Sequence, residues 1–159
     1  RGIQGREAIE LVSAGQLFAE TIRSFNGVEY LLFPKIMGLA ERGWNAYPAW
    51  EELRGAQEQQ AFNKALALYY EKISDMEMPY WARNGIHFRL PHPGLLVKDG
   101  KLYANVAIRG AEIRYTTDGS EPDAQSALWE APIPCHAPEV KAKTFCQGKE
   151  SLPITLKTE

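Results

Sequence analysis

The stretch Gln16-Leu17-Phe18-Ala19-Glu20-Thr21-Ile22-Arg23-Ser24 places a short apolar segment directly before polar residues, and a helix-like run, Val28–Trp44, follows it. A (β/α)₈ barrel presents its ligand-contacting groups in this way, at the C-terminal ends of its strands and ahead of the next helix. In that arrangement Phe18 and Glu20 would project into the mouth of the barrel. The pattern therefore indicates a ligand site without naming the ligand.

The run after this stretch has the signals of a helix that begins near Gly27. Asn26 and Glu29 have the spacing of a capping box, with Asn in place of the usual Ser or Thr. Pro34 lies about two turns into the apolar pattern, where it removes a backbone donor, so the helix should bend or restart there. The predicted apolar face comprises Val28, Leu31, Leu32, Ile36, Leu39 and Ala40.

Size and composition predict a globular protein with a real hydrophobic core. The 159 residues, 45% of them hydrophobic, leave room for one domain or two small ones. Eighteen basic and twenty acidic residues give a formal net charge of -2, and no basic cluster is long enough to follow a phosphate backbone. Nucleic acid is therefore not an expected partner.

No targeting or membrane segment is recognisable in the sequence. No apolar run approaches the ~20 residues that span a bilayer. The first residues, Arg1-Gly2-Ile3-Gln4-Gly5, lack the charged-then-apolar layout of a signal peptide. Because the chain opens in mid-motif rather than with Met, we expect it to be a piece of a longer protein whose targeting signal lay upstream.

The cysteines and histidines do not form the patterns of a metal site or a disulfide scaffold. Cys135 and Cys146 are too few for such a scaffold and lack the paired spacing of zinc ligands, so we expect buried, unbridged thiols. His87, His92 and His136 are scattered, without the i,i+4 pairing of ligands on one helix. Neither a metal nor another cofactor is predicted.

A regular apolar stripe predicts a long amphipathic helix after residue 56. Its members repeat at alternating four-residue and three-residue steps, and such a stripe usually packs in a core: Phe62, Leu66, Tyr69, Ile73, Met76 and Tyr80. Pro79 should disturb the last turn, and Asn84-Gly85 supplies a left-handed stop. Trp44 and Trp50, at helix ends ahead of this stripe, could stack on sugar rings, but beside apolar neighbours core positions are expected.

The hydrophobic period changes from helical to alternating across Phe88–Gly94, where two prolines and a glycine form a stiff linker. Asp99-Gly100 and Asp118-Gly119 have the glycine that tight turns favour. The alternating runs predict strands at Lys101–Ile108, Ala111–Thr117, Val140–Phe145 and Leu152–Leu156. The chain is thus predicted to be an α+β protein with a helical part, residues 1–90, and a small antiparallel β-sandwich, residues 94–159.

Together these motifs resemble one family, the bacterial family 20 β-N-acetylhexosaminidases of the chitobiase type. The Gln-Leu-aromatic-x-Glu-Thr segment at Gln16–Thr21, with Tyr30-x-x-Phe33-Pro34 and Ala40-Glu41-Arg42-x-Trp44, resembles the last strand, loop and helix of their catalytic barrel. Gly100–Asn105 and Ile113–Pro122 resemble their C-terminal immunoglobulin-like domain. The resemblance implies a helical remnant of a (β/α)₈ barrel in residues 1–90 and an immunoglobulin-like sandwich in residues 94–159. Residues 6–14 depart from the family pattern.

The resemblance also implies a chemistry and a share of its site. These enzymes remove terminal N-acetylhexosamine by substrate-assisted retaining hydrolysis, which needs an adjacent Asp-Glu pair. None of the four aspartates, Asp75, Asp99, Asp118 and Asp123, precedes a glutamate, so this chain should carry no catalytic residue and be inactive alone. Glu20 matches the carboxylate that accepts hydrogen bonds from sugar hydroxyls. Phe18 matches the aromatic wall of the sugar pocket, which is usually Trp.

Two interpretations follow from the sequence. The chain is either the C-terminal fragment of an exo-acting glycoside hydrolase, acting on an N-acetylhexosamine-containing glycan, or a non-catalytic sugar-binding or scaffold module built on the β-sandwich. The barrel-like residues before Gly94 favour the first. The resemblance implies a periplasmic, cell-surface or secreted location. Because the apolar face that begins at Val28 lacks the barrel strands it would cover, we also expect the fragment to self-associate.

Overall fold

The computed structural model describes residues 17, 20 and 22–158. It opens with two short helices, α1 (Phe25–Leu32) and α2 (Lys35–Trp44), which are separated at the cis peptide bond Phe33-Pro34. The predicted restart at Pro34 is therefore confirmed. The predicted start is wrong by two residues, because Ser24 caps α1 and its side chain accepts a hydrogen bond of 3.2 Å from the Gly27 amide.

A long helical run follows a 3₁₀ turn, η1 (Ala49–Glu52). It comprises α3 (Gly55–Lys72), one π-helical turn, η2 (Ile73–Glu77), and α4 (Met78–Arg83). Pro79 lies just after the π turn, where it lacks the N–H that a continuous α-helix would need. As predicted, the run stops at Asn84 and Gly85, and Gly85 has the left-handed φ of 70°.

The π turn changes which side chains of this run are buried. Each π turn inserts one extra residue and so rotates the following turn relative to an α-helical stripe. Met78 and Trp81 are consequently buried after Ile73. Met76 and Tyr80, which the regular stripe placed in the core, are 65% and 53% exposed. Phe62 and Leu66 of the same stripe are each 37% exposed, so the prediction of a core position is wrong for these four residues.

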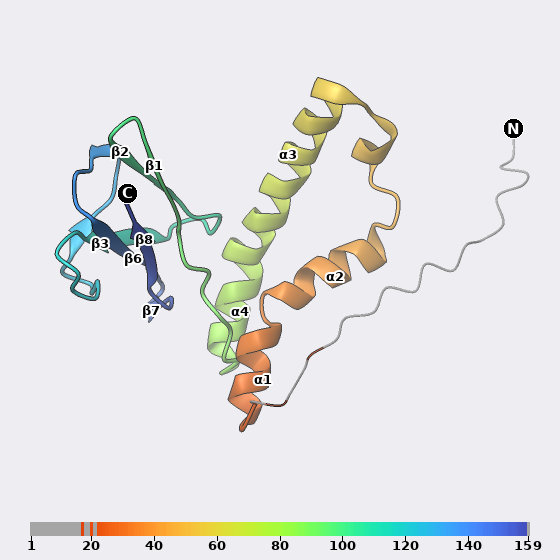
Figure 1. Ribbon diagram of the computed structural model, residues 1–159. Coiled ribbons are helices and arrows are strands. Elements are labelled where there is room, and N and C mark those ends of the chain that lie inside the picture. Colours follow the sequence, from red (N-terminus) through yellow and green to blue (C-terminus); the bar gives the residue numbers. More distant parts are fainter. Residues whose placement is uncertain (1–16, 18–19, 21, 159) are drawn as a thin grey trace, which may run out of the picture.

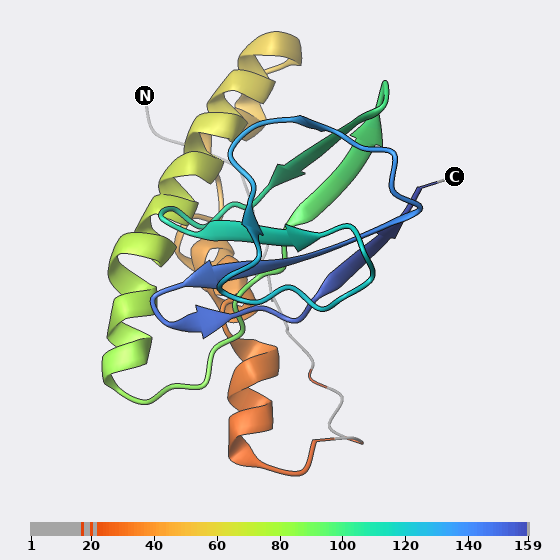
Figure 2. The same cartoon turned by 90° about the vertical axis from the view of Figure 1, so that its left-hand side faces the viewer.

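Eight strands follow α4, and all of their pairings are antiparallel. One sheet has the order β1-β2-β5, built from β1 (Gly94–Lys98), β2 (Lys101–Asn105) and β5 (Ile133–Pro134). The other has the order β4-β3-β6-β7, with β8 also paired to β6; its strands are β4 (Ala127–Leu128), β3 (Glu112–Thr116), β6 (Glu139–Cys146), β7 (Lys149–Glu150) and β8 (Ile154–Lys157). Figure 2 shows these strands in front of the helical run.

The two sheets pack face to face. Leu102 of the first sheet is fully buried with Val140 of the second, and Ala104 is buried with Ile113 and Ala142. The structure thus confirms a helical part followed by antiparallel sheets. The predicted strands correspond to β2, β3, β6 and β8, although β2 ends at Asn105 and leaves Ile108 in a loop.

The two predicted Asp-Gly turns have different roles. Asp99 and Gly100 both have positive φ, 51° and 69°, and join β1 to β2 in a tight hairpin. Asp118 and Gly119 instead begin the longer loop between β3 and β4. There the Asp118 carboxylate accepts hydrogen bonds from the amide and hydroxyl of Ser120, which lower its pKa.

A buried lysine holds that loop against the outer face of the second sheet. Lys143 of β6 has a side chain only 7% exposed, and its Nζ lies 2.5 Å from Glu121 of the loop and 3.3 Å from Glu150 of β7. The hydrogen bond to Glu121 is the largest cause that raises the pKa of Lys143, and the same bond lowers the pKa of Glu121. Both groups therefore stay charged and attract each other at neutral pH.

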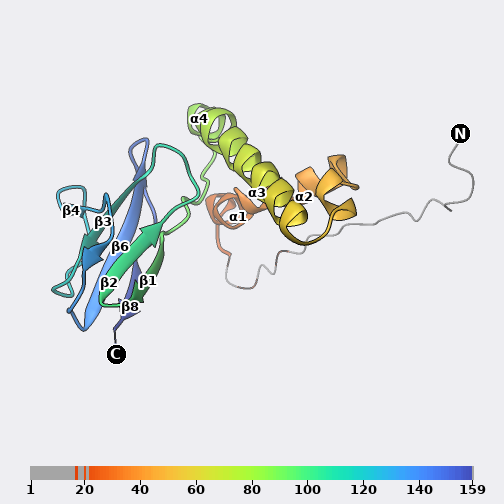
Figure 3. The same ribbon diagram turned by 90° about the horizontal axis from the view of Figure 1, so that it is seen from above.

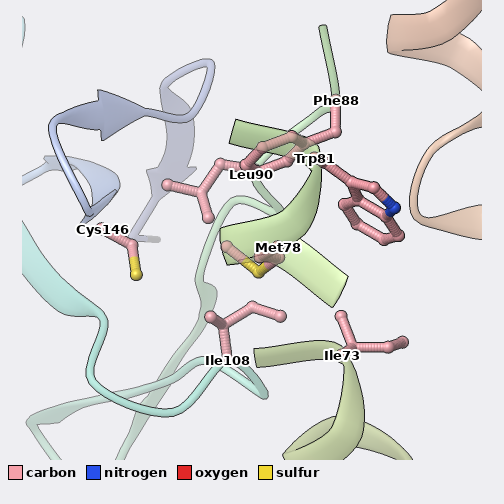
Figure 4. Packing of buried hydrophobic residues seen from close by; sticks show 7 residues of the cluster. All are labelled: Ile73, Met78, Trp81, Phe88, Leu90, Ile108 and Cys146. Atoms are coloured by element: carbon pink, nitrogen blue, oxygen red, sulfur yellow. The ribbon is translucent and has the colours of Figure 1, made fainter. Parts of the chain in front are cut away.

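One buried cluster joins the helices to the sandwich, and Figure 4 shows its side chains converging from both parts. Its members are Ile73, Met78, Trp81, Phe88, Leu90, Ile108 and Cys146. Trp81 packs on Phe33 and Phe88, with ring centroids 5.1 and 5.3 Å apart. We call this set of residues, together with Phe33, the Trp81 cluster. The helical run and the sandwich therefore share a core across the proline-containing linker.

The two cysteines lie in different cores. Cys146 belongs to the Trp81 cluster, whereas Cys135 packs with Leu102 and Val140 inside the sandwich. Both are buried and unbridged, as the sequence predicted. Burial raises the pKa of the Cys146 thiol, which favours its protonated form.

Substitution of Trp81 provides the first prediction. Trp81→Ala removes the central ring of the Trp81 cluster, so the free energy of unfolding should fall by about 3–5 kcal/mol. Tyr80→Ala, the neighbouring aromatic residue, is the matched control and should change it by no more than about 0.5 kcal/mol, because Tyr80 is exposed. Urea titration measures both. Equal losses for the two variants would contradict the placement of the core.

Candidate functional site

The residues predicted to contact a sugar lie just ahead of α1. Glu20 is in a turn and is exposed, whereas Phe18 lies outside the described residues. Within the part of the chain that the structure describes, no hydrogen bond or ion pair engages the Glu20 carboxylate. An exposed carboxylate can accept hydrogen bonds from the hydroxyls of a ligand.

The linker between α4 and β1 holds α1 in place. No residue of α1 is fully buried, so its position depends on contacts at its surface. The amide of His87 donates to the Glu29 carboxylate at 3.0 Å, and the amide of Arg89 donates to the Phe33 carbonyl at 3.1 Å. The Arg89 guanidinium also lies 6.0 Å from the centre of the Tyr30 ring. Glu29 thus bonds to the linker, rather than completing the predicted capping box with Asn26.

A second set of polar contacts joins the loop after β2 to the π turn. The amide of Arg109 donates to Ser74 Oγ at 3.0 Å, and that hydroxyl donates to the Tyr70 carbonyl at 2.7 Å. The Arg109 guanidinium lies 2.9 Å from Asp75 and 3.4 Å from Glu71. These ion pairs are about half exposed and each contributes at most about 1 kcal/mol. Their role is to fix the loop that delivers Ile108 to the Trp81 cluster.

The two tryptophans considered as possible stacking surfaces for sugar rings, Trp44 and Trp50, have different environments. Trp44, at the last position of α2, is 93% exposed, so the core position expected for it is wrong within this chain. Trp50 packs edge-on against Phe62, with centroids 5.1 Å apart, but it is only partly buried.

An apolar cavity of about 200 Å³ lies between α2 and α3, and Trp50, Phe62 and Leu66 are among its lining residues. Gly38 and Tyr69 also line the cavity, and a Cβ on Gly38 would be in ordinary van der Waals contact with the Tyr69 hydroxyl, at 3.6 Å. Burial, with smaller contributions from Tyr70 and Glu41, raises the pKa of Tyr69, so this phenol is neutral at physiological pH.

The described residues offer no further chemical site of an obvious kind. They include no cluster of three or more His, Cys, Asp or Glu side chains that could hold a metal ion. None of the helices in residues 22–158 is long and apolar enough to cross a membrane.

Comparison with known proteins finds similarity to the C-terminal part of one family. Residues 77–151, from the end of η2 to just after β7, match the family model described as the chitobiase/beta-hexosaminidase C-terminal domain. N,N'-diacetylchitobiase of Vibrio harveyi is 33% identical over 116 residues, which cover 67% of this chain and 13% of the relative. Beta-hexosaminidase of Vibrio vulnificus is 30% identical over 123 residues, covering 66% of this chain and 14% of the relative.

The family-model match and the two relatives point to the same family that the sequence motifs resemble. The chain is similar to the C-terminal part of the family 20 glycoside hydrolases of the chitobiase and β-hexosaminidase type. It spans only 13–14% of the length of these two relatives. The matched region starts inside the helical run, ahead of the linker, and so includes Trp81 as well as the strands β1 to β7, but not β8.

Sequence reasoning missed the residues that join the two parts. The hydrogen bond between Glu29 and the His87 amide connects positions 58 residues apart, and no local sequence pattern predicts such a contact. The Arg109 contacts depend on the π turn, for which Pro79 was the one visible signal. Of the two residues predicted to contact a sugar, Glu20 lies on the surface ahead of α1, and Phe18 lies outside the described residues.

Proposed function

We propose that this chain is the C-terminal part of a β-N-acetylhexosaminidase, a protein that removes terminal N-acetylhexosamine from glycans or chitooligosaccharides by substrate-assisted retaining hydrolysis. The observation that carries the proposal is the match of residues 77–151 to the chitobiase/beta-hexosaminidase C-terminal domain, directly behind barrel-like motifs at Gln16–Thr21 and Ala40–Trp44. A free-standing binding module has no need of those motifs.

In this chemistry the acetamido oxygen of the substrate attacks the anomeric carbon, so the enzyme supplies no nucleophile. A glutamic acid protonates the leaving oxygen, and the aspartate before it orients the acetamido group. This chain has no adjacent Asp-Glu pair, so both groups come from elsewhere in the longer protein. General acid catalysis alone contributes about 10²- to 10⁴-fold.

The contribution of this chain is one side of the pocket for the terminal sugar. Glu20 accepts hydrogen bonds from sugar hydroxyls, and Phe18 presents an apolar wall to the pyranose ring without the N–H that a tryptophan would add. Residues 1–90 are then the last part of the catalytic barrel, and residues 94–159 an immunoglobulin-like domain. The resemblance to the family favours a location outside the cytoplasm.

A chromogenic assay tests this proposal. The longer protein should release nitrophenol from a nitrophenyl N-acetylglucosaminide, and the 159-residue chain should release none above background. Glu20→Ala in the longer protein should lower kcat/KM by about 10- to 100-fold, the range expected when a charged hydrogen-bond acceptor is lost.

Three results would count against the proposal. Turnover by the 159-residue chain within about tenfold of the longer protein would show that the missing Asp-Glu pair is not required. An unimpaired Glu20→Ala protein would remove Glu20 from the sugar site. A longer protein without hexosaminidase activity would refute the assigned reaction.

The proposal also predicts self-association of the isolated chain. No residue of α1 or α2 is fully buried. Ile36 of the predicted apolar face is 36% exposed and the other members are only partly buried, so this face is incompletely covered. Sedimentation of the 159-residue chain should show a mass that rises with protein concentration. A monomer at all concentrations, with no binding of a dye specific for apolar surface, would contradict this.

A further inference from the structure

Helix α1 is attached to the rest of the described chain by very few contacts. In residues 22–158, the hydrogen bond from the His87 amide to the Glu29 carboxylate is the one side-chain hydrogen bond that connects α1 to a distant segment. Its length is 3.0 Å, and Glu29 itself is only partly exposed. Because the acceptor is a carboxylate, this bond is stronger than one between neutral groups.

The segment that receives this bond is itself held by the sandwich. Phe88, the residue after His87, is buried against Trp81, and the Lys149 ammonium of β7 lies 4.6 Å from the centre of its ring. Leu90 is buried in the same cluster as Cys146 of β6. Glu29 therefore ties α1 to a segment whose position the sheets determine, and Figures 1 and 3 show α1 beside the end of the helical run nearest to the sandwich.

We propose that Glu29 is a positioning residue for the sugar site: by bonding to the His87 amide it fixes α1, and with it Glu20, relative to the C-terminal sandwich. This inference rests on the proposed function. Helix α1 begins at Phe25, only a few residues after Glu20, so a displacement of α1 reaches Glu20 through a short connection. The sandwich then acts in the reaction without touching the substrate, as the support against which the end of the barrel is held.

The structural half of the proposal is testable on this chain without any activity. Glu29→Ala removes the acceptor, so exchange of the His87 amide hydrogen should become about tenfold faster or more. Glu29→Gln keeps an acceptor oxygen of the same reach and should stay within about threefold of the unchanged chain. Glu52→Ala is the control, because the exposed Glu52 side chain makes no hydrogen bond or ion pair among the described residues. Unchanged exchange in Glu29→Ala would overturn the proposal.

The functional half uses a double-mutant cycle in the longer protein. Glu20 would contact the sugar in the ground state and the transition state alike, so its displacement should raise KM and spare kcat. Glu29→Ala should therefore raise KM about fivefold with kcat within about twofold, and Glu29→Gln should restore KM. In a Glu20→Ala background, Glu29→Ala should have no further effect, because both changes remove the same contact.

The outcomes separate this inference from the function on which it rests. Additive effects of the two alanine substitutions, or an unchanged KM in Glu29→Ala, would overturn the positioning role while leaving the reaction intact. A longer protein that lacks hexosaminidase activity would refute the proposed function, and the exchange of the His87 amide would still show whether Glu29 holds α1. The inference would be supported if Glu29→Ala raises KM, Glu29→Gln does not, and Glu29→Ala has no effect on KM in the Glu20→Ala background.

Discussion

The packing of Trp81 between Phe33 and Phe88 is the interaction on which the arrangement of the chain depends. One neighbour comes from the corner between α1 and α2 and the other from the linker, while Ile108 and Cys146 close the cluster from the sandwich. A large aromatic side chain buries enough apolar area to fix the geometry of such a junction. Trp81 can reach this position because the π turn before Pro79 rotates α4 toward the sheets.

This junction supports the positioning role that we propose for the β-sandwich. In Figures 1 and 3 the long helix α3 lies between the sandwich and α2, with α1 near its end. The ends of a barrel's strands and their loops contact substrate, but they stay in place only if the helices behind them are supported. The linker contacts of α1, together with the Trp81 cluster, connect the segment that carries Glu20 to the C-terminal strands.

Local patterns predicted the strands well and the helix packing less well. Alternating residues and the turn at Asp99-Gly100 mark β2, β3, β6 and β8. Strand β1 was missed, because its Leu95-Leu96-Val97 does not alternate, and strands as short as β4, β5 and β7 have too few residues to show a period. On the long helix the predicted stripe is buried at Ile73 and partly buried at Tyr69, whereas Phe62 and Leu66 are each 37% exposed. After Ile73 the extra residue of the π turn shifts the buried positions, and Pro79 is the one sign of that turn in the sequence. The sequence motif was enough to propose Glu20 as a sugar-contacting residue. The hydrogen bond between Glu29 and the His87 amide joins residues 58 positions apart, so only the folded structure reveals it.

The central claim is that the helices and the sandwich form one cooperative unit because they share the Trp81 cluster. The most direct measurement is denaturant unfolding of the 159-residue chain, followed by the far-ultraviolet ellipticity of the helices and, in the same samples, by the amide resonances of β6. A shared core predicts that the two signals change at the same midpoint with the same slope. Loss of the helical signal at lower denaturant, with β6 still folded, would contradict the account.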